Sequence, residues 1–201
     1  MYGSVQDDLR RPLLYKKGEP IPMKTLETNR LILRAFRESD LEDFYAYAST
    51  PNVGPNAGWK PHADRAESRK ILRSFIEEDE VWALVDKISG KVMGSIGLHK
   101  DPVRNNPATR MVGYAMSEDY WGKGLMPEAL ERVLRFAFEE AGMDIVWVCH
   151  YPFNIRSKRN IEKAGFVYEG TQRQASVRYD GVVLDKATYS LTKEEYEALH
   201  R

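Results

Sequence analysis

Residues 120–130, YWGKGLMPEAL, combine requirements that few backbone conformations satisfy together. Two glycines flank Lys123, and Pro127 opens a strongly amphipathic helical pattern. Glycine reaches positive φ without steric cost, and proline is tolerated in the first turn of a helix. Free backbone N–H groups and the helix dipole make such a turn suited to an anion. The segment therefore predicts a strand-to-helix turn that either binds a phosphate-bearing ligand or serves only as a connection.

Two common phosphate-binding motifs do not fit this segment. A nucleotide P-loop needs a glycine five residues before Gly122 and Ser or Thr after Lys123, whereas Ser117 and Gly124 occupy those positions. A dinucleotide-binding fingerprint needs a third glycine where Pro127 stands, and it follows the first strand of a parallel unit. A nucleotide-binding protein is therefore a distant alternative.

Hydrophobic periodicity and turn residues predict the elements around this turn. We expect a strand at 26–36, a helix from 39, an irregular loop at 51–62, a helix from 64, a hairpin turning at 89–90, a strand at 109–117, the helix after the turn, a strand at 144–149, a short helix ending at 165, a hairpin around 180–181 and a last helix from 192. This order predicts an α+β domain over residues 25–201, with one mostly antiparallel twisted sheet of about seven strands and helices on both faces. Residues 1–24, which include three prolines, are predicted to form an N-terminal extension.

Composition excludes several classes of function. The chain has 30 basic and 30 acidic residues, so it offers no broad positive face for nucleic acid or an anionic membrane. No apolar run approaches the roughly 18 residues of a membrane helix. The single cysteine, Cys149, rules out an intrachain disulfide and favours a reducing compartment. We therefore expect a cytoplasmic protein without a metal site, and a homodimer is compatible with the sequence.

A second polar constellation lies about thirty residues after the turn, in NIRSKRNIEKAGF. On a helix, residues at three-residue steps share one side, which here would carry Asn154, Ser157, Asn160 and Lys163. The opposite side would place Ile155, Ile161, Ala164 and Phe166 toward the core. An alternative is that Asn154 only caps the helix and the other polar residues face solvent.

Together, LETNRLILRAFRESDLEDFY, WGKGLMPEAL and NIRSKRNIEKAGFVYEG, in this order, resemble the GNAT superfamily of acyl-CoA-dependent N-acetyltransferases. Within it, the chain is most similar to the branch that contains ribosomal-protein N-terminal acetyltransferases. The resemblance covers about residues 25–198. It implies a GNAT-like fold, acetyl-CoA as the acyl donor and a primary amine as the acceptor.

The resemblance also implies which residues hold coenzyme A. The pyrophosphate would be bound by amides of the turn, namely those of Trp121, Gly122, Lys123, Gly124, Leu125 and Met126. The pantetheine arm would pair with Tyr114, Ala115 and Met116 where their strand splays away from the strand at 144–149. Asn154 would hydrogen-bond this arm, Ser157 would lie near the thiol, and Lys163 would complete the set. Asp119 departs from the Gln or Arg that is usual three residues before the first glycine.

Acetyl transfer requires a neutral amine, a polarised carbonyl and a proton for the departing thiolate. We expect Ser157 to donate to the sulfur, while Glu169, His150 or a water chain remain open as the base. The expected acceptor wall consists of Tyr45, Trp59, His62 and Tyr179. The acceptor could be a protein N-terminus, a small amine, a polyamine or an antibiotic. A catalytically silent acyl-CoA sensor is the alternative from another functional class.

Overall fold

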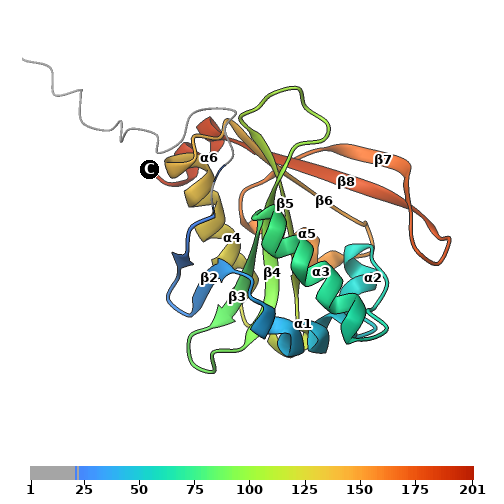
Figure 1. The fold of residues 1–201 in the computed structure, drawn as a ribbon. Coiled ribbons are helices and arrows are strands. Elements are labelled where there is room, and N and C mark those ends of the chain that lie inside the picture. The colour runs from blue at the N-terminus through green and yellow to red at the C-terminus, as the bar shows by residue number, and fades with distance from the viewer. Residues whose placement is uncertain (1–20, 22) are drawn as a thin grey trace, which may run out of the picture.

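The computed structural model describes residue 21 and residues 23–201, and its centre is one eight-stranded sheet (Figure 1). The strand order is β1-β2-β3-β4-β5-β6-β8-β7, and every neighbouring pair is antiparallel except β5 and β6. The strands are β1 Leu26–Glu27, β2 Leu31–Ala35, β3 Val81–Asp86, β4 Val92–Lys100, β5 Thr109–Met116, β6 Ile145–His150, β7 Val167–Val177 and β8 Val183–Thr192. The predicted α+β class and mixed sheet are confirmed.

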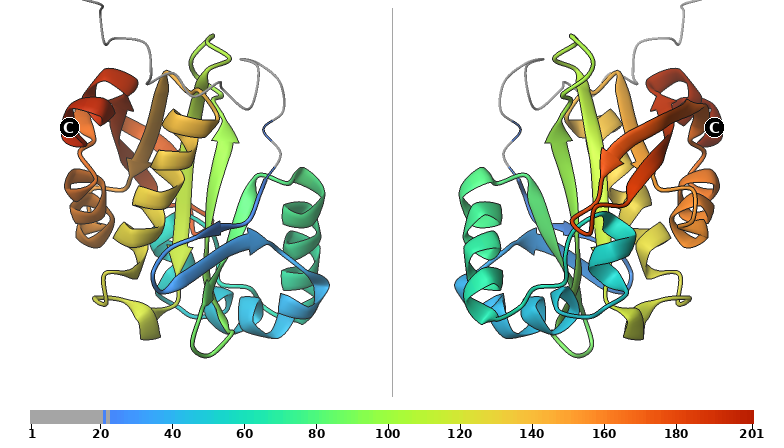
Figure 2. Two further views of the ribbon diagram at one scale, coloured as in Figure 1. Left: turned by 90° about the vertical axis from the view of Figure 1, so that its left-hand side faces the viewer. Right: turned by 90° about the vertical axis from the view of Figure 1, so that its right-hand side faces the viewer.

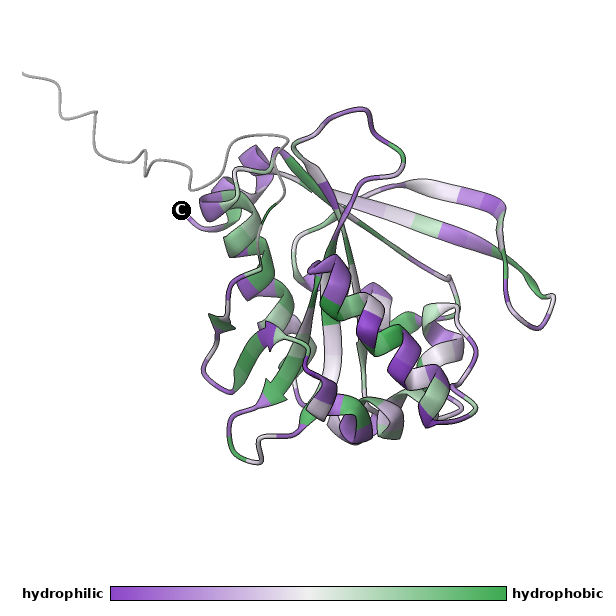
Figure 3. Ribbon diagram, in the orientation of Figure 1, coloured by the Kyte–Doolittle hydropathy of each residue, from purple (hydrophilic) through white to green (hydrophobic). Residues whose placement is uncertain are grey.

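Helices cover both faces of this sheet (Figure 2). They are α1 Leu41–Ala48, α2 Val53–Ala57, α3 Arg65–Glu78, α4 Leu125–Arg135, α5 Ile155–Lys163 and α6 Lys193–Leu199, with 3-10 turns η1 Glu38–Asp40 and η2 Glu118–Tyr120 and a π-helical turn η3 Phe136–Glu140. Both α3 and α4 alternate hydrophobic and hydrophilic bands, as amphipathic helices do (Figure 3). Two apolar clusters result, one between α4 and the sheet around Leu130, the other between α1, α3 and the sheet around Phe44 and Leu72.

Two local predictions were wrong. The single strand expected at 26–36 is two strands, because Thr28 forms a turn in which its Oγ1 accepts a hydrogen bond from the N–H of Leu31 at 2.9 Å. The loop expected at 51–62 contains α2. Pro55 lies in the first turn of α2, where its missing N–H costs no helical hydrogen bond, and Gly58 ends the helix with φ of +92°.

The domain includes the last residues of the predicted N-terminal extension. Ile21 and Met23 pack against the larger apolar cluster. The carbonyl of Lys24 accepts a hydrogen bond from Trp82 Nε1 at 2.9 Å. Residues 1–20 and 22, which make up the rest of the extension, lie outside the described residues.

The sheet divides between β5 and β6. Their parallel pairing covers only Thr109 to Met111, opposite Ile145 to Trp147. Beyond this point β5 stays paired with β4 as far as Met116, while β6 stays paired with β8 as far as His150. The two halves of the sheet therefore diverge, as the resemblance implies (Figure 1). Among the described helices, none is both long and apolar enough to cross a membrane.

Candidate active site

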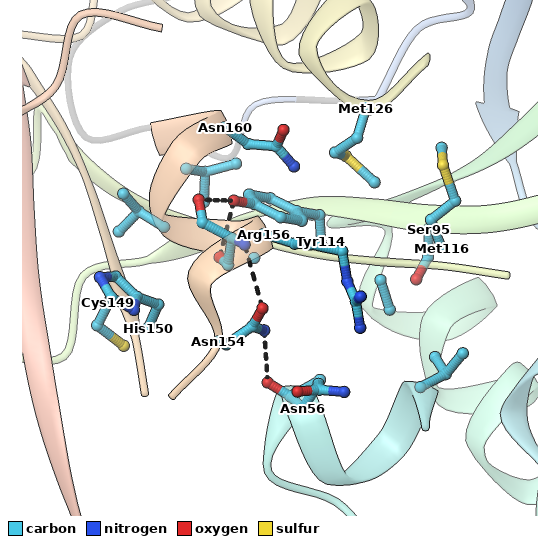
Figure 4. Close-up of a pocket in the computed structure, with 18 of the residues that line it drawn as sticks. Asn56, Ser95, Tyr114, Met116, Met126, Cys149, His150, Asn154, Arg156 and Asn160 are labelled. Atoms are coloured by element: carbon cyan, nitrogen blue, oxygen red, sulfur yellow. Dashed lines mark hydrogen bonds between the residues drawn. The ribbon is translucent and has the colours of Figure 1, made fainter. Parts of the chain in front are cut away.

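A cavity of about 710 Å³ occupies the gap between the diverging strands. Tyr114, Met116 and Met126 line it on the side of α4 and α5, and Figure 4 shows these side chains together with Asn154, Arg156 and Asn160. Ser95 and Trp59 line it on the side of α1 and α3. Since one cavity touches both faces of the sheet, it passes through the sheet where β5 and β6 have separated.

The turn before α4 has the geometry that the glycines predict. Gly122 and Gly124 have φ of +74° and +72°, and a Cβ built on Gly122 would meet no atom within 4 Å. The N–H groups of residues 122–126 have no hydrogen-bond acceptor among residues 21 and 23–201. These amides at the positive end of a helix dipole fit a diphosphate.

Most of the residues expected at the turn reach the cavity. Trp121, Gly122, Gly124, Leu125 and Met126 all line it. Lys123 does not line it, and its Nζ lies 5.0 Å from the centre of the Tyr120 ring. Asp119 is exposed and also lies outside the lining, so its carboxylate does not oppose an anion in the cavity.

Arg30, which sequence reasoning missed, directly precedes β2 and supports the turn. Its Nη1 donates to the carbonyl of Lys123 at 2.9 Å, and its Nε donates to Glu128 Oε2 at 2.7 Å. Partial burial raises the pKa of Glu128, but hydrogen bonds from Thr28 and Arg30 outweigh this effect and leave the pKa lowered. Arg30 lies 93 residues before Lys123, so no local pattern could have identified this contact.

We expect Arg30→Ala to weaken acetyl-CoA binding about fivefold, because the turn loses the donor that holds the carbonyl of Lys123. The melting temperature should change little, because exposed ion pairs contribute about 0–1 kcal/mol to stability. Titration calorimetry and thermal unfolding measure the two quantities. Arg73→Ala is the matched control, because Arg73 also forms an exposed ion pair, with Glu38, and does not line the cavity. Equal affinities in the two variants would contradict the role of Arg30.

The end of β5 is tied to the turn by Trp121. Its Nε1 donates to the carbonyl of Met116 at 2.7 Å, so this carbonyl is already used within the protein. The Arg156 guanidinium lies over the Trp121 ring at 3.9 Å from its centre. Arg156 also lines the cavity and was not among the predicted site residues. Its position fits a cation that faces an anionic ligand at the turn.

Helix α5 presents its predicted polar side to the cavity. Asn154, Ser157, Asn160 and Lys163 all line it. Asn154 caps the helix, because its Oδ1 accepts from the N–H of Ser157 at 3.1 Å, and its Nδ2 donates to the carbonyl of Asn56 in α2 at 3.0 Å (Figure 4). The expected core position of Ile155 was wrong, since this residue is 49% exposed at the start of the helix.

Tyr114 and Ser157 form a hydroxyl pair in the cavity. Tyr114 Oη lies 3.0 Å from Ser157 Oγ. Burial raises the pKa of Tyr114 to about 12, with hydrogen bonds from Ser157 and Asn160 acting in the opposite direction. The phenol therefore keeps its proton at neutral pH and can donate it to Ser157 Oγ. This arrangement leaves the hydroxyl hydrogen of Ser157 available to a third atom.

The two residues expected as bases lie in different surroundings. His150 lines the cavity but is 6% exposed; its Nδ1 lies 2.8 Å from the carbonyl of Tyr151 and must donate to it. Its Nε2 is buried without a partner among the described residues. Glu169 does not line the cavity, because it lies on β7, where both carboxylate oxygens accept from Arg104 Nη2 at 2.7 Å. Nε2 of His150 is thus a nitrogen that is unpartnered within the described part of the chain and that solvent does not reach, while the carboxylate of Glu169 lies outside the cavity lining.

Of the expected acceptor wall, Trp59 alone lines the cavity. The Tyr45 ring is covered by the Arg65 guanidinium at 4.8 Å. His62 Nδ1 lies 2.8 Å from Ser68 Oγ, and its ring packs against Trp59 from outside the cavity. Tyr179 is 47% exposed in the loop between β7 and β8. These three residues therefore lie outside the cavity lining, with His62 directly behind Trp59.

Comparison with known proteins decides the family. The sequence model of the acetyltransferase (GNAT) domain matches residues 30–167. The chain belongs to the GNAT acetyltransferase family. It is accordingly an N-acetyltransferase, and members of this family use acetyl-CoA in general.

Individual relatives agree with this GNAT assignment. The probable N-acetyltransferase YjcK of Bacillus subtilis is 29% identical over 90% of this chain and 98% of its own length. The [ribosomal protein uS5]-alanine N-acetyltransferase of Escherichia coli is 24% identical over 88% of this chain and 94% of its own. The crystal structure of a GCN5-related N-acetyltransferase from Brucella melitensis superposes with a TM-score of 0.78, at 25% identity, over 93% of this chain and 87% of that one.

Proposed function

We propose that this GNAT protein transfers the acetyl group of acetyl-CoA to a primary amine, and that the acceptor is the α-amine of a protein N-terminus. The observation that carries the proposal is the cavity through the divided sheet, with unpaired amides of residues 122–126 at one end and Trp59 and Ser95 at the other. The likeness to an enzyme named for an alanine of ribosomal protein uS5 supports a peptide acceptor.

Several groups would hold coenzyme A in this cavity. The amides of the turn would face the diphosphate, and three cationic side chains of α5, those of Arg156, Arg159 and Lys163, line the same cavity. The backbone of Tyr114 and Ala115 lies on the edge of β5 that β6 has left, where an extended amide-bearing chain can add to the strand. Acetyl-CoA supplies the thioester whose acyl carbon the amine attacks.

The residues of the chain supply positioning and proton handling. Holding the amine and the thioester in contact replaces a bimolecular encounter, which is the largest contribution expected of the cavity. Ser157, oriented by Tyr114, donates a hydrogen bond to the sulfur as the C–S bond breaks. Overall, a new N–C bond replaces the C–S bond. The acceptor ammonium loses two protons, one of which ends on the thiol and one in solvent.

We expect acetyl-CoA at 100 times its Kd to stabilise the protein by about 2.7 kcal/mol, and ATP and NAD to have no effect. For a domain of this size the gain corresponds to a melting temperature about 5–10 °C higher. Release of free thiol is then followed with a peptide that begins with alanine, with spermidine and with kanamycin. Turnover on spermidine or kanamycin alone would contradict the peptide acceptor. Binding without turnover on any amine would contradict transfer and indicate a sensor.

A further inference from the structure

We propose that His99, oriented by Glu80, is the general base that takes the proton of the acceptor amine; this inference rests on the proposed acetyl transfer. His99 lies on β4 and lines the cavity on the face that carries Ser95 and Gly97. The same face of β5 carries Met111, Gly113 and Ala115, which stand directly opposite these residues. His99 is therefore at the acceptor side of the gap and was not identified by sequence reasoning.

Two glycines make room for the imidazole. Gly97 of β4 and Gly113 of β5 are cross-strand partners. A Cβ built on Gly97 would overlap His99 Nε2, and one on Gly113 would lie 3.7 Å from the same atom. The ring thus lies over Gly97, and its Nε2 is also near Gly113, which is two residues beyond the last β5–β6 pair at Met111. Nε2 therefore lies on the strand next to the gap, level with the place where β5 and β6 begin to diverge.

Glu80 places a carboxylate beside one nitrogen of His99. Its Oε2 lies 3.4 Å from His99 Nδ1, and the two side chains are 29% and 30% exposed. A carboxylate beside Nδ1 favours the tautomer with its proton there, which leaves the lone pair of Nε2 toward the cavity. A carboxylate in this position also stabilises the imidazolium that forms when Nε2 takes up a proton. His150 differs from His99, because the Nε2 of His150 is buried and has no partner among the described residues.

The step balances without another reactant. Nε2 accepts one proton from the ammonium, and the neutral amine then attacks the acyl carbon. The imidazolium, paired with Glu80, later releases that proton to solvent. The other charged groups around the pair are Arg110, whose guanidinium interacts electrostatically with Glu80, and Lys186, which lines the same cavity.

The first test is the tautomer of His99 in the full-length protein, read by two-bond ¹H–¹⁵N spectra of ring-labelled histidine. Only four histidines are present, so His99→Gln assigns the signal directly. We expect the neutral ring to carry its proton on Nδ1 and to shift toward the other tautomer in Glu80→Gln. A proton on Nε2 in the neutral wild-type ring would overturn the proposal, whatever the activity of the protein.

The second test is kinetic, with acetyl-CoA and the peptide that begins with alanine. At pH 7 an α-amine with a pKa of about 8 is only about one-tenth neutral, so His99→Gln should lower kcat about tenfold there and have little effect at pH 9. The KM for acetyl-CoA should not change. Added imidazole should restore activity to His99→Ala, which a structural role would not allow. His200→Gln, at the end of α6 and away from the cavity, is the control.

The outcomes separate this inference from the proposed function. If acetyl-CoA does not stabilise the wild-type protein, the proposed function fails. If the wild type turns over and His99→Gln has the same kcat at pH 7 and pH 9, only the role of His99 fails. If the wild type binds acetyl-CoA but does not turn over this peptide, the proposed peptide acceptor fails, and the tautomer spectra alone test the role of His99.

Discussion

We expect the Gly122→Asp variant to bind acetyl-CoA on the order of 1,000-fold more weakly than the Gly122→Asn variant, because a carboxylate near the diphosphate costs about 4 kcal/mol at a separation of about 4 Å. Both side chains are the same size, and both tolerate positive φ better than other residues. Nothing lies within 4 Å of a Cβ at this position, so neither variant should disturb the fold.

Titration calorimetry of both variants measures the difference, and thermal unfolding without ligand confirms that the two proteins are equally stable. Gly181→Asp is a further control, because Gly181 also has positive φ and an open Cβ position but lies in the β7–β8 loop, away from the cavity. Similar affinities for acetyl-CoA in Gly122→Asp and Gly122→Asn would mean that the amides at the start of α4 do not bind the diphosphate.

We expect Ser157→Ala to lower kcat about 100-fold and to change the Kd for coenzyme A less than about twofold, since a positioned acid typically contributes at least this factor to the rate. Tyr114 retains the backbone carbonyl of Ser157 at 3.4 Å as an acceptor, so the variant leaves its phenol partnered. Burst kinetics of thiol release distinguish slow chemistry from slow product dissociation. A reduced affinity with an unchanged kcat would instead assign Ser157 to binding.

Ser74→Ala is the matched control, because Ser74 donates to the carbonyl of Ile71 on α3 and lies outside the cavity lining.

The Tyr114→Phe variant removes the phenol hydroxyl and keeps the hydroxyl of Ser157. Because the folded-state pKa of Tyr114 is raised to about 12, its neutral form persists through the neutral range and ionises only at high pH. The wild type should therefore lose stability from about pH 10 to 12, and Tyr114→Phe should lose less.

The turn and the polar side of α5 were predictable because their signals are local. Gly122 and Gly124 adopt the positive φ that their residue type allows, and the helix begins directly after them. Asn154 and Ser157 share one side of a helix because of the 3.6-residue period, whatever the helix packs against. The divergence of β5 and β6 came from the resemblance to a family, since no residue pattern marks where two strands cease to pair. The homodimer stays a prediction.

The remaining expectations depended on distance in space. Glu169 and Tyr179 have side chains suited to an active site. Glu169, however, lies on β7 and accepts hydrogen bonds from Arg104, and Tyr179 lies in a loop outside the cavity lining. His99 was overlooked because its neighbours in the sequence are ordinary strand residues. Its role arises from Glu80, which precedes the adjacent strand, and from Gly113 on the other side.

The chain order of elements, the glycine turn and the amphipathic helices follow from the sequence, because backbone preference and hydrophobic period act over a few residues. Which charged groups meet is decided by the folded sheet. Arg30 contacts Glu128 across 98 positions, and Asn154 contacts Asn56 across the same separation. Such contacts exist only once strand pairing has fixed the register, because a shift of one residue would turn each side chain to the opposite face.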